Sequence, residues 1–233
     1  MTDIKLNRRQ QNQIDLQIRE HQKYSRKYKL DPLIRLAPGV VLDNFVMHPH
    51  VFQPLSSRFL ACHLFQNPAL SQGKNVIDIG TGSGVLGLVC GIQGAKSVTL
   101  SDISPLAFKN TRENIKIHKM VGRCQVVQGD LFENVKMDAD LITFAQPYFP
   151  GNPMKDIPVT MGMLADAELI HRFFEQAKPY LKGAILMPYL EWVGPINNPG
   201  VQAPKHGFNV RVVYEKLING IQKGKFRIYE MTL

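Results

Sequence analysis

Residues 75–102 read NVIDIGTGSGVLGLVCGIQGAKSVTLSD, two short apolar segments separated by a glycine-rich turn and a helix-like stretch. The first segment, Asn75 to Ile79, runs directly into glycines at positions 80, 82 and 84. Glycine allows a sharp turn and a close approach of the backbone to a ligand, where a Cβ would collide. The order of strand, glycine turn and helix is typical of a nucleotide cradle in an α/β protein.

The same alternation continues along the chain. Short apolar segments predict strands, and the amphipathic stretches between them predict helices. We expect strands at 75–79, 97–101, 125–127, 141–144 and 184–187, and helices at about 85–94, 105–118 and 165–180. Two alternating runs, 209–218 and 225–233, follow without a helix between them, so they must pair antiparallel. The pattern predicts a Rossmann-like doubly wound α/β sheet, mostly parallel, with a C-terminal antiparallel hairpin.

The chain before residue 51 has a different character. Ile14, Leu16 and Ile18 form a thin apolar stripe among polar residues, which predicts a weakly packed helix that could act as a cover. Several prolines then predict an irregular stretch, with a short strand or hairpin at 39–46. We therefore expect an N-terminal helix and lid segment over 1–50 and the main domain over 51–233, beginning with a helix at 56–65.

Composition and charge limit the function classes. The 233 residues are 44% hydrophobic, enough for a large core, and carry a net charge of +9. Residues 1–35 hold nine Lys or Arg against four acids, and 203–233 hold six against two, so the ends supply the whole excess. We expect either solvated basic surfaces or a nucleic-acid or acidic-substrate surface.

The cellular location and the redox state of the cysteines are predicted from patterns that the sequence lacks. No run of eighteen apolar residues and no signal-peptide pattern occurs, which predicts a soluble, cytoplasmic protein. The three cysteines, Cys62, Cys90 and Cys124, form no CxxC pair and predict reduced, buried thiols. No metal site is expected.

The glycine loop alone does not choose the cofactor. Gly82, Gly84 and Gly87 also satisfy the dinucleotide pattern GxGxxG, with Asp102 twenty residues further on. Asp78 before the loop would repel a pyrophosphate and attract a cationic amino group. This carboxylate favours S-adenosylmethionine, whose methionine part carries an ammonium.

Two later strand ends add to this site. Asp102 and Ile103 follow the second strand, where they would meet the ribose hydroxyls and the adenine face. Asp130 and Leu131 follow the third strand, with the carboxylate placed to accept a hydrogen bond from the adenine amine. Carboxyl ends of parallel strands share one edge of the sheet, so we expect these residues to form one site.

These segments resemble a known family. DIGTGSG at 78–84, SDIS at 101–104, QGDLF at 128–132 and AQPY at 145–148 are similar to the motifs of class I S-adenosylmethionine-dependent methyltransferases, over about residues 50–233. The resemblance implies that Thr81 and the loop glycines bind the cofactor. The stretch from Val51 to Pro54 looks most like HemK-type glutamine N-methyltransferases and their nucleic-acid N-methylating relatives, which adds Gln53 to the cofactor-binding candidates.

The fourth motif departs from that group. HemK-type relatives carry Asn-Pro-Pro-Tyr, whose Asn accepts hydrogen bonds from the substrate NH2 while the aromatic ring stacks on it. Here Ala145 lacks that acceptor, Gln146 is the candidate replacement, and Pro147 and Tyr148 keep the turn and the ring. We take Ala145, Gln146 and Tyr148 as candidate catalytic residues, although the lost hydrogen bond, worth about 1 to 3 kcal/mol, puts a glutamine or adenine substrate in doubt.

Other residues are candidates for the acceptor side. His48 and His50 are either general bases or structural histidines. Tyr24, Tyr28 and Trp192 are either a pocket cover or packing residues.

Several functions remain open. The leading hypothesis is methyl transfer to a small molecule or a side chain. The alternatives are attack on the γ-carbon of the methionine part, as in cyclisation to azetidine-2-carboxylate or aminocarboxypropyl transfer with release of methylthioadenosine; RNA or protein glutamine N-methylation; and a non-catalytic nucleic-acid-binding module. The hypothesis of an NAD-dependent dehydrogenase is supported only by the overlapping glycine pattern.

Overall fold

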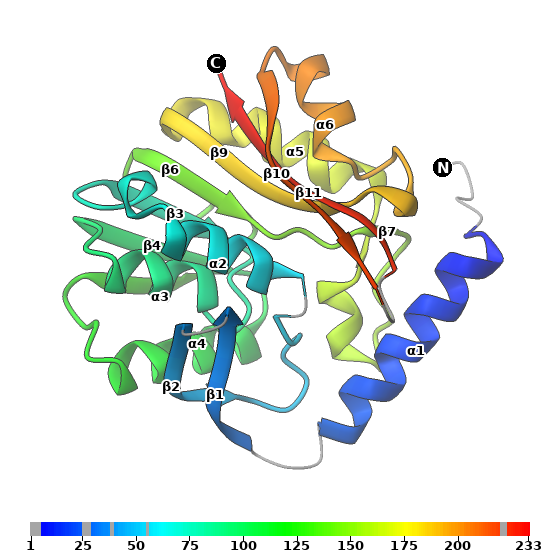
Figure 1. Ribbon diagram of the computed structural model, residues 1–233, viewed down its shortest axis with the longest axis horizontal. Coiled ribbons are helices and arrows are strands. Elements are labelled where there is room, and N and C mark those ends of the chain that lie inside the picture. The colour runs from blue at the N-terminus through cyan, green and yellow to red at the C-terminus, as the bar shows by residue number, and fades with distance from the viewer. Residues whose placement is uncertain (1–5, 25–28, 38–39, 55, 220–222) are drawn as a thin grey trace.

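The computed structural model describes residues 6–24, 29–37, 40–54, 56–219 and 223–233, with the backbone alone for 22–24, 29–37, 40 and 41. Within these residues, seven strands form one sheet in the order β10-β11-β9-β6-β3-β4-β5 (Figure 1). Their bounds are β3 Asn75–Ile79, β4 Ser97–Asp102, β5 Cys124–Gln128, β6 Ala139–Phe144, β9 Leu181–Leu190, β10 Asn209–Ile218 and β11 Gly224–Thr232. The five strands from β5 to β9 are parallel, and β11 runs antiparallel to both neighbours. The fold class predicted from the sequence is confirmed.

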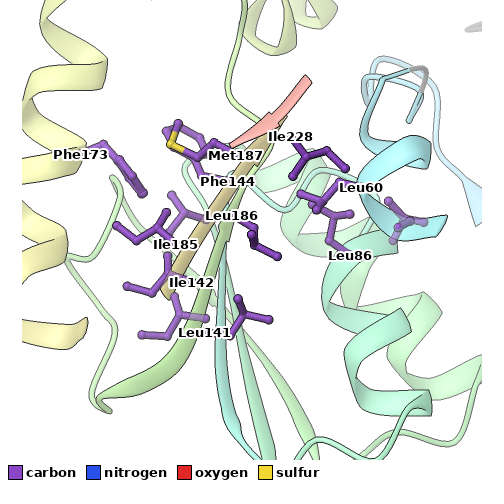
Figure 2. Close-up of a cluster of buried hydrophobic side chains, with 14 of the residues drawn as sticks. Leu60, Leu86, Leu141, Ile142, Phe144, Phe173, Ile185, Leu186, Met187 and Ile228 are labelled. Carbon is purple, nitrogen blue, oxygen red and sulfur yellow. The ribbon is translucent and has the colours of Figure 1, made fainter. Parts of the chain in front are cut away.

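Helices cover both faces of this sheet. In Figure 2, Leu60 and Leu86 pack on one side of the central strands and Phe173 packs on the other. The helices are α1 Arg8–Tyr24, α2 Ser57–Gln66, α3 Val85–Ile92, α4 Pro105–Ile117, α5 Ala167–Ala177 and α6 Pro199–Gln202. Apolar side chains between the sheet and the helices on each face form the core that holds the strand ends in place.

Local sequence explains where the helices beside the site begin. The Ser104 hydroxyl accepts a hydrogen bond from the Ala107 N–H, and Pro105 occupies the first turn of α4, where its missing N–H is not needed. Asp166 caps α5 in the same way through the Leu169 N–H. The first residues of α4 therefore lie directly beyond the end of β4.

The N-terminal region differs from the irregular stretch predicted from the sequence. Strand β1 (Lys29–Ala37) pairs antiparallel with β2 (Val40–Met47) in a hairpin. The backbone of Val46 in β2 is held by α4, since its N–H donates to Asn114 Oδ1 and its carbonyl accepts from Asn110 and Asn114. The hairpin is thus part of the packed structure, and the division at residue 50 stays a prediction.

Helix α1 lies apart from the other helices, alongside the end of the sheet (Figure 1). Ile14 and Ile18 are buried, and the Gln10 side chain donates to the Val193 carbonyl. Arg9 stacks over the Trp192 ring at 4.1 Å. The predicted N-terminal helix is confirmed, and few contacts hold it.

Part of the C-terminal charge is neutralised within the fold. Arg211 pairs with Glu230, and Arg227 and Lys225 both pair with Glu215. Among the described residues, no helix is long and apolar enough to cross a membrane. The cytoplasmic location stays a prediction.

Candidate active site

A cavity of about 1030 Å³, including the part open to solvent, lies at the carboxyl ends of β3, β4, β5 and β6. Its wall contains most of the residues that the sequence singled out. These are Gln53, Gly80, Thr81, Gly82, Asp102, Ile103, Asp130, Leu131 and Ala145. The strand ends therefore meet at one site, as predicted.

The glycine loop forms the floor of this cavity. Gly82 has φ +59°, and a Cβ placed on it would contact nothing within 4 Å, because it would project into open space. Gly84 has φ +90° and ends the turn as the N-cap of α3. The Thr111 hydroxyl donates to the Gly82 carbonyl at 2.9 Å, so α4 fixes the loop from behind. The loop is held by this hydrogen bond and leaves room where a ligand would contact the backbone.

Asp102 connects this loop to the end of β4. One carboxylate oxygen accepts from the Gly82 N–H at 2.8 Å, and the other accepts from the Ser104 N–H at 2.9 Å. Burial raises the pKa of Asp102, and these two hydrogen bonds oppose that shift. Each carboxylate oxygen can accept more than one hydrogen bond, so Asp102 can still bind hydroxyl groups of a ligand in the cavity.

The cavity wall next to Asp102 consists of apolar side chains and one ion-paired carboxylate. Ile103 is 52% exposed although it is apolar, and it lines the cavity. Leu131 lies buried with φ +50°. Asp130 pairs with Arg172 of α5 at 2.5 Å, a partner that the sequence did not indicate. The exposed Ile103 side chain offers a flat apolar surface for a ring.

Asp78 does not lie where the sequence placed it. The side chain is fully buried and is not part of the cavity wall. Its carboxylate accepts from the hydroxyls of Thr81 at 2.6 Å and Thr143 at 2.8 Å, and from the Gly87 N–H at 3.2 Å. Burial raises its pKa to about 6. Direct contact with a ligand ammonium does not fit this geometry, because Asp78 instead holds the glycine loop.

The end of β6 separates the main cavity from a smaller compartment. Ala145 lines both, and Pro147 lines the main cavity. Tyr148 and Gln146 line only the compartment. The Gln146 amide donates to the Asn197 carbonyl, so its nitrogen is already bonded.

Two further candidates lie elsewhere. His48 pairs with Glu113 at 2.7 Å, and neither His48 nor Trp192 is among the cavity-lining residues. His50, with φ +68°, does line the cavity. Tyr28 and the side chain of Tyr24 lie outside the described residues.

The structure adds site residues that sequence reasoning missed. Gln17 of α1 lines the small compartment, and Pro158, Val159, Met161 and Gly162 of the 3₁₀ segment η2 (Pro158–Gly162) line the main cavity. His21 of α1 accepts a hydrogen bond from the Gln53 N–H and stacks on Phe52. These segments come together only through tertiary packing, so no local motif signals them.

Known proteins provide a comparison for this geometry. Residues 45–187 match the family model described as "Methyltransferase small domain". The chain belongs to this family. It is therefore a methyltransferase-fold transferase whose cofactor is S-adenosylmethionine, and solved proteins with this fold contain S-adenosylhomocysteine.

Individual relatives act on macromolecules according to their names. This methyltransferase is 32% identical over 141 residues to a "Putative protein N5-glutamine methyltransferase" of Methanocaldococcus jannaschii, an alignment covering 58% of this chain and 69% of that protein. It is 38% identical over 73 residues to the ribosomal protein L11 methyltransferase of Carboxydothermus hydrogenoformans, covering 31% of this chain and only 24% of that protein.

A solved structure extends the similarity over nearly the whole chain. The "putative RNA methyltransferase" of Pyrococcus horikoshii has a TM-score of 0.56 at 18% identity, and the match covers 98% of this chain and 97% of that one. At this identity the match shows the fold alone. The N-terminal helix and hairpin are therefore within the region of structural similarity.

Proposed function

We propose that this methyltransferase transfers the methyl group of S-adenosylmethionine to the nitrogen of a neutral side-chain amide, with a protein glutamine as the candidate acceptor. One observation carries the proposal. The carboxylates that line the main cavity, Asp102 and Asp130, belong to the strand ends of β4 and β5, whereas the wall around Ala145, Pro147 and Phe52 is neutral. A neutral wall suits an uncharged nucleophile, because a buried unpaired charge would be strongly disfavoured there. The name of the Methanocaldococcus relative supports the same acceptor class.

The cofactor half has the groups that a nucleoside with a sulfonium needs. Asp102 would accept hydrogen bonds from the ribose hydroxyls, and Ile103 would pack on the adenine. The open space beside Gly82 would hold the methionine part of the cofactor. Asp130 lines the same end, with Arg172 on one of its oxygens. We assign Asp78 an indirect role, since it holds Thr81 and the start of α3 rather than the ligand.

The chemistry asks the protein mainly for alignment. The bound cofactor supplies a methyl carbon that is electrophilic because it is attached to a sulfonium. With the cofactor bound, the acceptor nitrogen would form a bond to that carbon while the carbon–sulfur bond breaks with its electron pair left on sulfur, and the nitrogen would release a proton to water. The walls around Ala145 and Pro147 would align the nitrogen with the methyl carbon, and alignment is where most of the acceleration would arise.

A paired incubation tests the proposal. The protein is incubated with S-adenosylmethionine and a glutamine peptide, with the matched glutamate peptide as control. We expect S-adenosylhomocysteine and one added methyl group on the glutamine peptide alone. Release of methylthioadenosine would mean that the bond between sulfur and the γ-carbon of the methionine part is cut. Methylation of RNA or a small amine instead of the peptide would show that the acceptor is not a side-chain amide.

A further inference from the structure

The face of α1 that packs on the domain is unusually polar. Gln10, Gln17 and His21 are buried on it, spaced so that they share one side of the helix with Ile14. Burying an amide costs free energy unless it is hydrogen-bonded. Gln10 donates to the Val193 carbonyl, and His21 bonds to the Gln53 N–H and to the Gln17 carbonyl. Apolar residues would hold the helix at lower cost, so the polar face calls for another explanation.

Gln17 faces the small compartment beside the cofactor cavity. This compartment measures about 370 Å³, including its open part, and shares Phe52, Ser57, Ala145 and Gly162 with the cavity. None of its lining residues carries a charge. A group bound there would lie directly beyond Ala145, where the end of β6 meets the cofactor cavity.

One buried polar group in this compartment lacks a partner within the described part of the chain. Tyr148 is only 6% exposed, its hydroxyl makes no hydrogen bond, and Ser56 lies close to it without hydrogen-bond geometry. Gln17 is 3% exposed and lines the same compartment. Ser56 precedes α2 but gives no side-chain cap to that helix. By contrast, Gln146 is bonded to Asn197. The unbonded Tyr148 hydroxyl therefore points to a ligand in this compartment.

We propose that Gln17 of α1 is an acceptor-binding residue, supplying from the opposite wall the side-chain oxygen that Ala145 lacks. This inference rests on the proposed function, since it assumes a neutral NH2 group as the acceptor. The side-chain oxygen of Gln17 accepts one N–H of that group and so holds the nitrogen against the Tyr148 side of the compartment. Helix α1 is then part of the acceptor site through Gln17, while Gln10 and His21 hold the helix in place by their hydrogen bonds.

The test compares three variants with the wild type. Gln17→Ala should lower kcat/KM for the glutamine peptide by about tenfold to a hundredfold, the cost of one lost hydrogen bond, and leave the Kd for S-adenosylhomocysteine unchanged. Gln13→Ala, which removes another buried amide from α1 outside the compartment, should leave both values unchanged. The double variant Gln17→Ala with Ala145→Asn should recover activity, because the asparagine returns an oxygen to the acceptor site. Recovery distinguishes this role from mere support of the helix.

Two outcomes separate this inference from the proposed function. If the wild type methylates the peptide and Gln17→Ala does so equally well, the inference is overturned and the function stands. If the wild type methylates no glutamine, binding of propionamide to the S-adenosylhomocysteine complex is measured by NMR. Binding that is lost in Gln17→Ala would support the inference while the function fails, and equal binding to both proteins would overturn it.

Discussion

The two halves of the active site are built in different ways. The cofactor half consists of turns that follow β3, β4 and β5, so each of its residues is placed by the strand just before it. The acceptor half combines α1, the start of α2, the end of β6 and the segment 158–163, which meet only in the folded chain. The first half is built from local turns, whereas the second depends on the docking of a helix with few contacts. Substitutions in the first half should therefore act on cofactor affinity, and those in the second on acceptor turnover alone.

The largest expected effect is that of Asp102→Ala. The substitution removes the proposed ribose acceptor and the bonds to the Gly82 and Ser104 N–H groups. Hydrogen bonds to charged groups contribute about 1.5 to 3 kcal/mol each, so we expect the Kd for S-adenosylhomocysteine to rise about a hundredfold or more. Titration calorimetry measures it, with Asp138→Asn on the surface as the control. An unchanged Kd would show that this carboxylate does not belong to the cofactor half.

Asp78→Asn should change the pH dependence of stability. Burial raises the pKa of Asp78 from 3.8 to about 6, so the folded state binds this proton more tightly than the unfolded state. Stability from this group is present at low pH and is lost as pH rises through about 6. Relative to the wild type, the variant should gain about 2 kcal/mol in free energy of unfolding between pH 4 and pH 7. Urea denaturation at both pH values checks this, and parallel pH profiles of the two proteins would contradict it.

Gly82→Ala tests whether the loop faces a ligand. Alanine at φ +59° costs about 1 kcal/mol of strain, and its Cβ would project into the cavity. The matched control is Gly73→Ala, since Gly73 has φ +70°, also has nothing within 4 Å of an added Cβ, and lies outside the cavity. Both variants should lose similar stability in thermal denaturation. We expect only Gly82→Ala to weaken S-adenosylhomocysteine binding, by about tenfold, which corresponds to about 1.4 kcal/mol. Equal Kd values for the two variants would show that the loop does not contact the cofactor.

Ile103→Ala should give the smallest effect. The side chain is 52% exposed, so its removal leaves the stability nearly unchanged. Loss of apolar contact with an adenine ring should raise the Kd for S-adenosylhomocysteine by about threefold to tenfold. The exposed Val121, which lies outside the cavity, is the control as Val121→Ala. Similar affinities for both variants would place the adenine elsewhere.

The sequence predicted the cofactor half well because its signals are local. The strand at 75–79, the glycine loop and the acids after β4 and β5 all lie within a few residues of the elements that position them. Asp78 shows the limit of that reasoning. Its place before the loop suggested a ligand contact, but Thr143 of the neighbouring β6, 65 residues away in sequence, holds its side chain inside the protein.

The acceptor half could not be predicted in the same way. Gln17 is one of several glutamines in a polar helix, and only the packing of α1 brings it near Tyr148. Gln146 stays a candidate replacement for the missing asparagine, because its amide nitrogen donates to the Asn197 carbonyl and its side-chain oxygen takes no part in that hydrogen bond. Hairpin β1–β2 was missed in part because the prolines at 32 and 38 argued against strands.

The most direct test of the whole account is a crystal structure of the complex with S-adenosylhomocysteine. We expect the ribose hydroxyls within hydrogen-bond distance of Asp102, the adenine on Ile103, and the sulfur beside Ala145, facing the compartment lined by Gln17 and Tyr148. A nucleoside bound with its adenine toward Ala145, or outside this cavity altogether, would contradict the division into a cofactor half and an acceptor half.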